Sequence, residues 1–141
     1  MSVCLIIQPI HPAGTDRLRA AGVEVRPASG IDEATLAREI AGCVAVITRD
    51  AGVTRRVIEA APGLLVIGNH GAGTDPVDVA RATELGVPVV FTPGANAASV
   101  AEHALALMLA VAKRVVPADR AVRGGDFDYR YRAGSFELTG K

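Results

Sequence analysis

The sequence predicts an α/β domain with a parallel sheet of five strands and flanking helices. Short apolar segments recur at a regular interval, and most are continuous and rich in Val and Ile, as in parallel strands covered on both faces. The segments between them have the apolar spacing of short helices, and this alternation predicts βαβ units. The expected strands are Val3–Ile7, Val23–Val25, Val44–Ile47, Leu64–Ile67 and Val87–Phe91.

Four helices are expected between these strands, and most have recognisable start and stop residues. Their expected ranges are Pro12–Ala21, Asp32–Ala41, Thr54–Ala61 and Pro76–Leu85. Asp32, Thr54 and Asp75 are residue types that favour helix N-caps. The glycines expected just after the helix ends are Gly22, Gly42, Gly63 and Gly86. The order of elements predicts a flavodoxin-like, doubly wound architecture.

The chain changes character near Ser99, so we expect one domain over residues 1–98 and an interdomain segment over 99–141. The residues Ser99-Val-Ala-Glu102 fit a capping box with the serine as N-cap. The long helix that follows is apolar on all sides over residues 104–112, and such a helix needs covering on every side. We expect Pro117 to end or kink it, a short helix to reach Arg123, and a linker to follow.

Composition excludes several classes of function. The chain of 141 residues has 15 basic and 15 acidic residues, which leaves no basic field for nucleic acid. Its longest uncharged apolar stretch is far shorter than the roughly 20 residues that cross a bilayer. No signal peptide is visible, and Cys4 and Cys43 are too few for a disulfide scaffold. We therefore expect a cytoplasmic domain that binds neither nucleic acid nor membrane.

The glycine-rich loop after the fourth strand is the strongest candidate binding site. In an open parallel sheet, ligands gather outside the carboxyl ends of the strands. The loops expected there are Gln8–Pro12, Thr48–Gly52, Gly68–Thr74 and Thr92–Asn96. The backbone N–H groups of Gly71, Ala72 and Gly73 can converge, and a helix opening at Pro76 would favour an anion. The alternative is a glycine-rich turn that only connects a strand to a helix.

Arg49 and His70 are the candidate side chains near this loop. Arg49 follows the third strand and could pair with a carboxylate, although a solvated surface arginine would have the same pattern. His70 lies within the loop, whereas His11 is interpreted as a surface residue and His103 as a packed or interface residue. No pair of histidines has metal-ligand spacing and no Cys-x-x-Cys occurs, so no metal site is predicted.

Three other interpretations fail on the residues themselves. The loop begins like the dinucleotide fingerprint G-x-G-x-x-G, but Pro76 stands at the third glycine position and no acidic residue ends the next strand. Asp50 occupies the position of a receiver domain's phosphoacceptor, yet the first loop lacks the acidic pair that a receiver needs. Ser99 has no nearby His–acid pair, so a capping role explains it better than a nucleophilic one.

Three segments together resemble the N-terminal part of the D-isomer-specific 2-hydroxyacid dehydrogenases. These segments are Asn69–Asp78, Gly86–Asn96 and Ser99–Glu102, and their order and spacing are more specific than any one of them. The closing segment Glu137–Lys141 is also similar to the family's sequence just before its cofactor domain. The family includes D-3-phosphoglycerate dehydrogenase and glyoxylate/hydroxypyruvate reductases.

The resemblance implies that the first domain binds a small 2-keto or 2-hydroxy acid. By this resemblance, the backbone N–H groups of Ala72 and Gly73 would hold the substrate carboxylate, and Arg49 would contact the substrate. With His70 and Gly71 from the loop itself, the expected substrate-binding residues are Arg49, His70, Gly71, Ala72 and Gly73.

The resemblance also implies a nicotinamide cofactor, NAD or NADP, in the complete protein. Asn96, Ser99 and Val100 would lie near the domain cleft and the nicotinamide, and the helix Ser99–Val116 would form a homo-oligomer contact. The family's cofactor-binding glycines and catalytic side chains come after the position of Lys141, so this chain is predicted to be an inactive fragment. The alternatives are a stand-alone module that binds carboxylates or dimerises without catalysis, and a remnant without a ligand.

Overall fold

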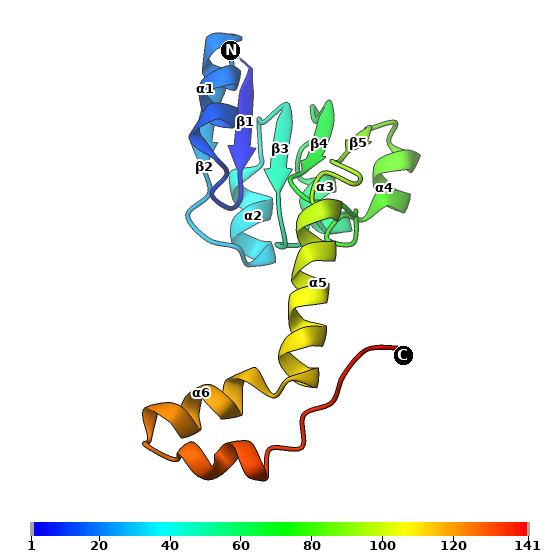
Figure 1. The fold of residues 1–141 in the computed structure, drawn as a ribbon. Helices are drawn as coiled ribbons and strands as arrows, with labels where there is room; N and C mark the ends of the chain where they lie inside the picture. Colours follow the sequence, from blue (N-terminus) through cyan, green and yellow to red (C-terminus); the bar gives the residue numbers. More distant parts are fainter. Residues whose placement is uncertain (1, 141) are drawn as a thin grey trace. The chain divides into compact units, whose positions relative to one another are not determined.

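The computed structural model describes residues 2–140, which form two units that divide between Ala95 and Asn96. The first unit contains a sheet and four α-helices, and the second contains two α-helices and a 3₁₀ helix (Figure 1). Within residues 2–140, no helix combines the length and the apolar character that crossing a bilayer requires.

The first unit is built on five parallel strands in the order β2-β1-β3-β4-β5. Their bounds are β1 Val3–Ile6, β2 Glu24–Pro27, β3 Ala45–Thr48, β4 Val66–Asn69 and β5 Val89–Val90. The strand order and the all-parallel pairing confirm the predicted fold class. The order reverses between β1 and β3, and in such sheets ligands bind beyond the carboxyl ends of the strands near this point.

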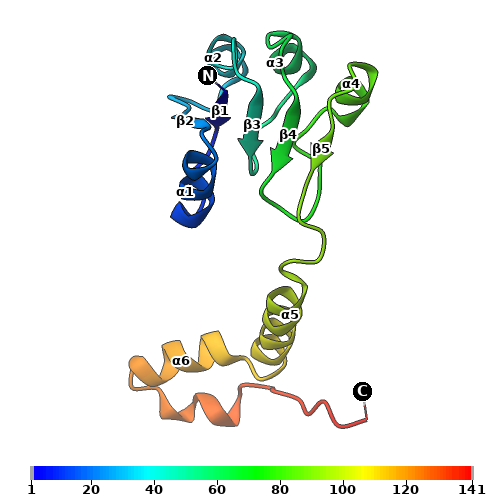
Figure 2. The same cartoon turned by 90° about the horizontal axis from the view of Figure 1, so that it is seen from above.

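Four helices of the first unit cover the sheet. They are α1 Pro12–Ala20, α2 Glu33–Glu39, α3 Arg55–Glu59 and α4 Val79–Glu84. Figure 2 shows α2, α3 and α4 following one another along one face, with α1 on the opposite face. This arrangement follows from right-handed crossovers, because β2 is added on one side of β1 and the later strands on the other.

The core lies between the sheet and the helices α2 and α3. The central strand β3 and its neighbour β4 each bury an alternate residue completely, Val46 in β3 and Ile67 in β4. Leu36 from α2 and Val57 from α3 pack into the same cluster with no exposed surface. Burying each such side chain contributes about 1.5–3 kcal/mol relative to leaving it exposed, so this layer dominates the stability of the first unit.

The expected helix starts at Asp32 and Thr54 have different outcomes. The Oδ1 atom of Asp32 accepts a hydrogen bond from the N–H of Thr35 at 3.0 Å, which confirms this N-cap. Thr54 occupies the N-cap position of α3, but its hydroxyl donates to Oε2 of Glu33 at 2.6 Å instead of capping the helix. The hydroxyl therefore links α3 to α2.

The expected helix start at Pro76, with Asp75 as N-cap, is wrong. The helix α4 begins at Val79, and Asp78 caps it by accepting a hydrogen bond from the N–H of Arg81 at 2.9 Å. A parallel bridge pairs Val77 with Val53, so the chain is held extended before the helix can begin.

Three of the four glycines expected after helices end them in the predicted way. Gly22, Gly42 and Gly86 adopt positive φ angles of 78°, 75° and 69°, a region that favours glycine. Gly63 does not adopt a positive φ, because α3 ends at Glu59 and Gly63 lies in a later turn.

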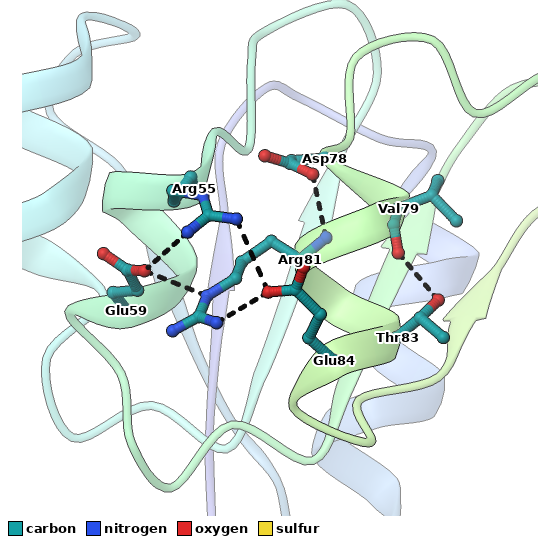
Figure 3. Close-up of polar contacts among 7 residues, drawn as sticks. All are labelled: Arg55, Glu59, Asp78, Val79, Arg81, Thr83 and Glu84. Carbon is teal, nitrogen blue, oxygen red and sulfur yellow. Dashed lines mark hydrogen bonds and ion pairs between the residues drawn. The ribbon is translucent and has the colours of Figure 1, made fainter.

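Ion pairs around the partly buried Arg81 connect α3 with α4 (Figure 3). The guanidinium of Arg81 contacts Oε1 of Glu59 at 2.9 Å and Oε2 of Glu84 at 2.7 Å. Arg55 contacts the same two carboxylates at 3.7 Å and 3.4 Å. Exposed pairs of this kind contribute at most about 1 kcal/mol each, so they fix the contact between the helices without dominating stability.

The second unit contains α5 Ala97–Ala112, α6 Val115–Arg123 and the 3₁₀ helix η1 Phe127–Tyr131. The predicted capping box at Ser99 and Glu102 is wrong, because the N-cap position of α5 is Asn96 and Ser99 lies inside the helix. The alanines at 97 and 98 are strong helix formers, which extends the helix toward its N-terminus.

The helix expected to run as far as Val116 is interrupted after Ala112. Arg114 adopts the left-handed conformation with a φ of 51°, and this residue turns the chain into α6. Pro117 lies in the first turn of α6, where its missing N–H has no helical partner to lose. The short helix expected to reach Arg123 is confirmed.

The side chains of α5 are largely exposed. Only Ala112 is buried among the residues of this helix, and the exposed fractions of its large apolar side chains range from 48% to 73%. The exposed large apolar residues of α5 are Val100, Leu105, Leu107, Met108, Leu109 and Val111. The covering that an all-apolar helix requires is thus not supplied within the second unit.

Candidate functional site

The loops after β1 and β3 are joined by one carboxamide. The Oε1 atom of Gln8 accepts hydrogen bonds from the N–H groups of Arg49, Asp50 and Ala51 at 3.1, 2.7 and 2.9 Å. The guanidinium of Arg49 also donates to the carbonyl oxygen of Pro9 at 3.2 Å. These bonds join segments about forty residues apart and hold Arg49 at the carboxyl edge of the sheet.

Asn69 ends β4 and fastens the glycine-rich loop that follows. Its Nδ2 atom donates to the carbonyl oxygen of Gly73 at 2.6 Å, which closes the loop. A Cβ atom at Gly71 would lie only 3.2 Å from the same Nδ2, so a glycine there leaves room for the carboxamide. The carbonyl oxygen of Gly71 accepts hydrogen bonds from the N–H and the hydroxyl of Thr92 at 2.9 and 3.0 Å.

Three successive residues of this loop have unpaired backbone donors. Within residues 2–140, the N–H groups of Gly71, Ala72 and Gly73 donate to no protein acceptor. The N–H of the preceding residue, His70, is paired with the carbonyl oxygen of Thr48 at 2.8 Å. Successive free N–H groups in a glycine-rich turn form the concave arrangement that binds anions.

A cavity of about 370 Å³ lies beside these donors. It brings together all five residues that the sequence singles out for substrate binding. Its lining residues are Arg49, Asp50, Asn69, His70, Gly71, Ala72, Gly73, Asp75 and Pro76. Two of the four loops expected to meet at this edge line the cavity, and hydrogen bonds of Gln8 and Thr92 link the other two loops to them. The arrangement can bind a small carboxylate.

A second cavity, of about 200 Å³, shares Asn69 and His70 with the first. Its other lining residues are Ile10, Ile47, Gly68, Val90, Phe91 and Thr92. Asn69 is only 5% exposed. Its Oδ1 atom is buried and has no hydrogen-bond partner in the described part of the chain. A buried acceptor without a partner is costly, so a donor on a ligand would be favoured at this atom.

The sequence matches the profile of the catalytic domain of the D-isomer specific 2-hydroxyacid dehydrogenases over residues 4–136. The chain belongs to this family. Two relatives named D-3-phosphoglycerate dehydrogenase, from Archaeoglobus fulgidus and Methanocaldococcus jannaschii, are each 40% identical to it over 138 residues. The alignments cover 97% of this chain and 26% of each relative, so the chain spans about a quarter of their length.

Solved structures agree with the fold of this 2-hydroxyacid dehydrogenase domain. The TT0316 protein from Thermus thermophilus is similar with a TM-score of 0.80 and 34% identity, covering 87% of this chain and 40% of that chain. An NADPH-dependent glyoxylate/hydroxypyruvate reductase from Sinorhizobium meliloti, solved with NADP and malonate, gives a TM-score of 0.78 and 26% identity. That alignment covers 97% of this chain and 41% of the reductase.

The residues expected near a cofactor lie in the second unit of the dehydrogenase domain. Asn96 is the N-cap residue of α5, and Ser99 and Val100 are exposed in its first turns. The glycine-rich loop of the first unit does not fit a dinucleotide, because it is followed by an extended segment rather than by a helix. The helix dipole is therefore no part of the anion site, which rests on free N–H groups and Arg49.

Sequence reasoning missed Gln8, Asn69 and Thr92, whose side chains hold the loops in place. Each of the first two is a polar residue that closely follows an apolar strand segment, and this position was the signal that could have found them. The partners of Gln8 and Thr92 are distant in the sequence, so only the folded chain shows what these residues bind.

Proposed function

We propose that this chain is the substrate-binding portion of an NAD- or NADP-dependent D-2-hydroxyacid dehydrogenase. The observation that carries the proposal is the row of unpaired N–H groups at Gly71–Gly73, which lies beside Arg49 in one cavity. The ligand is a small 2-keto or 2-hydroxy acid, whose carboxylate accepts hydrogen bonds from these donors. Family membership and the names of the relatives support this substrate class.

Five of the lining residues have a defined part in binding the acid. The N–H groups of Ala72 and Gly73, with that of Gly71, hold the carboxylate, and the Arg49 guanidinium adds a positive charge. His70 lines both cavities and contacts the remainder of the acid. Because Gln8 and Asn69 fix the two loops, the donors are preorganised before the acid binds.

The nicotinamide cofactor is held mainly by another part of the parent protein, with Asn96, Ser99 and Val100 on the side of the cleft. The NADP in the structure of the Sinorhizobium reductase supports a cofactor of this class. The cofactor supplies or accepts a hydride at the second carbon of the acid, and the present chain binds and orients that acid. Hydride transfer also needs a proton donor or acceptor at the substrate oxygen. We propose that other parts of the parent protein supply this group and most of the cofactor site, and that this chain alone is therefore inactive.

Isothermal titration of the 141-residue chain with oxalate, a planar mimic of the substrate, tests carboxylate binding. We expect heat of binding and a raised Tm at millimolar oxalate. Arg49→Gln should weaken binding about tenfold or more, since an ionised hydrogen-bond donor contributes about 1.5–3 kcal/mol. Arg38→Gln, an exposed change on α2 that lines neither cavity, is the matched control. An unchanged Tm and no heat would contradict the proposal.

The parent protein should be a cytoplasmic homo-oligomer that uses the exposed apolar helices of the second unit. The expected contact segment Ser99–Val116 now corresponds to most of α5 and the first residues of α6. Light scattering of the parent protein at micromolar concentration should show a dimer or a larger assembly, because exposed apolar patches of this kind mark interfaces. A monomer would contradict this part of the proposal.

A stand-alone module that binds carboxylates or dimerises without catalysis is the second candidate. The division into two units favours it, because the binding loops and the exposed helices lie in separate units. The intact mass of the protein expressed from its own gene separates the candidates. A mass near 14.5 kDa supports the module, and a mass several times larger, followed by NADH oxidation with 2-keto acids, supports the dehydrogenase.

A further inference from the structure

A cavity of about 350 Å³ lies between α3 and α4. Leu64 and Val87 line it just before β4 and β5 begin, so the cavity is at the amino ends of the strands, the edge opposite the glycine-rich loop. Its volume is within the range of small-molecule sites, roughly 300–1,000 Å³. Its apolar lining residues are Ile58, Ala61, Pro62, Leu64, Leu85 and Val87. Of these, Ile58, Ala61 and Leu64 are at most 5% exposed, so the core holds this wall in place without a ligand.

Arg81 contributes an incompletely paired guanidinium to this cavity. Within residues 2–140, its side chain makes one hydrogen bond, from Nη1 to Oε2 of Glu84 at 2.7 Å. The Nε atom lies 2.9 Å from Oε1 of Glu59, but its N–H does not point at that oxygen, so this buried donor makes no hydrogen bond. The Nη2 atom makes none either and is not buried (Figure 3). Its two N–H groups are therefore available to a ligand.

Glu59 supplies the opposite charge in the lining of the same cavity. Its Oε1 atom lies 3.7 Å from Nη1 of Arg55 and 2.9 Å from Nε of Arg81. In the part of the chain that the structure describes, neither carboxylate oxygen of Glu59 accepts a hydrogen bond, and the side chain is 42% exposed. Such a carboxylate can accept hydrogen bonds from an ammonium group, which has three N–H donors.

The charges beside the cavity favour a ligand that carries both signs. Two arginines, Arg55 and Arg81, contact two glutamates, Glu59 and Glu84, so the charges of this cluster offset one another. A ligand with one charge gains one partner but lies near a like charge, whereas a zwitterion gains both partners. Because Arg81 and Glu59 are in contact, the two charged groups of the ligand must also be close together. An ammonium and a carboxylate on one carbon atom meet this requirement.

We infer that this cavity is a second ligand site, which takes a small aliphatic α-amino acid. The carboxylate of the amino acid accepts hydrogen bonds from Nη2 of Arg81, and its ammonium group donates to Glu59. Its aliphatic side chain lies against Ile58, Leu64 and Val87, where burial of apolar surface favours binding. All the lining residues belong to the first unit, and none belongs to the glycine-rich loop, so the inference is independent of the proposed function.

Titration of the isotope-labelled 141-residue chain with L-valine, followed by amide NMR signals, tests the inference. We expect millimolar affinity and shifts of the amide signals of residues 58–64 and 81–87. Isovalerate lacks the ammonium group of valine, isobutylamine lacks the carboxylate and glycine lacks the side chain, so each should bind at least fivefold more weakly. Absence of these shifts up to the solubility limit of valine, shifts confined to the glycine-rich loop, or a smaller difference for any analogue overturns the inference.

Neutral variants of the two charged lining residues separate direct contact from support of the helices. Glu59→Gln and Arg81→Gln should each raise the dissociation constant of valine at least threefold. Glu59→Gln should also remove the preference for valine over isovalerate, which a loss of stability alone would not do. Glu84→Gln and Arg55→Gln are the matched controls, because these residues belong to the same ion-pair cluster but do not line the cavity. Equal losses in the lining and control variants would mean that the ion pairs only hold α3 against α4, and would overturn the inference.

Discussion

The two units of the chain place their apolar side chains in opposite environments. In the first unit, Leu5, Leu36 and Ile67 have no exposed surface, because helices and sheet cover them. In the second unit, Leu107 is 52% and Val111 is 73% exposed on α5. Burial of apolar surface is the main favourable term in folding, so the first unit has its own source of stability, whereas the apolar side chains of α5 in the second unit contribute little to it.

The largest test of this difference is a leucine truncated in the core. Leu36→Ala should lower the free energy of unfolding by about 2–5 kcal/mol, because it leaves a cavity that the neighbouring side chains cannot fill. Urea denaturation followed by circular dichroism measures the change. Leu65→Ala is the matched control, since this leucine of the same unit is 66% exposed and should cost less than about 0.5 kcal/mol. Equal losses in the two variants would mean that the core does not determine stability.

The ionisation of a buried thiol should also report on how well the core of the first unit excludes water. Burial raises the pKa of Cys4 from 9.0 to about 11, and the neighbouring Cys43 adds to the shift. The folded state thus favours the neutral thiol, so its contribution to stability is complete below pH 9 and is lost as the pH rises through about 11. A shift of this size corresponds to a loss of about 2–3 kcal/mol.

Unfolding free energies between pH 8 and pH 11 measure this loss. The matched variant Cys4→Ala lacks the thiol, so the difference between its pH profile and that of the native chain isolates Cys4 from other groups that titrate in this range. Parallel profiles would mean that water reaches the thiol and that the core is more open than the structure indicates.

Sequence patterns were sufficient for the order and approximate positions of the elements of the first unit. Continuous Val-rich segments predict parallel strands because both faces of the sheet are covered, and the strands of the structure lie at or near those segments. Local signals also worked where the interaction is local. Asp32 caps the helix that follows it, and Gly22 ends α1 with a positive φ.

The predictions failed where a distant partner decides the local structure. The start of α4 depends on the bridge between Val77 and Val53, which no local pattern at Pro76 reveals. The break after α5 occurs at Arg114, a residue type that does not favour positive φ. The candidate loop was found from its glycines, but its supports, Gln8 and Asn69, act through hydrogen bonds that only the folded chain forms.

Charges on α5 should weaken any assembly that covers this helix. Leu107 and Val111 are four residues apart and lie on the same side of α5, so Leu107→Glu with Val111→Glu places two charges on one apolar stripe. If the proposed homo-oligomer forms through α5, its dissociation constant should rise at least tenfold, about 1.4 kcal/mol, by analytical ultracentrifugation. The unfolding of the first unit should not change. Arg123→Gln on α6 is the control, and a native chain that is monomeric at every concentration would show that α5 needs no partner.

The smallest effect is expected from the surface ion pairs between α3 and α4, whose side chains, apart from that of Arg81, are largely exposed. Glu84→Gln removes the carboxylate that contacts both Arg81 and Arg55, and it should lower the free energy of unfolding by less than about 1 kcal/mol. Because exposed charges are screened, the loss should disappear in about 1 M NaCl, where the Debye length is about 3 Å.

Urea denaturation at low and high salt separates this surface contribution from the core. Glu102→Gln on α5 is the matched control, because this glutamate has no ion pair in the part of the chain that the structure describes. A loss for Glu84→Gln that exceeds about 2 kcal/mol, or that persists in high salt, would mean that the pairs behave as buried ones. The stability of the first unit would then depend on its surface as well as on the layer of Leu36 and Ile67.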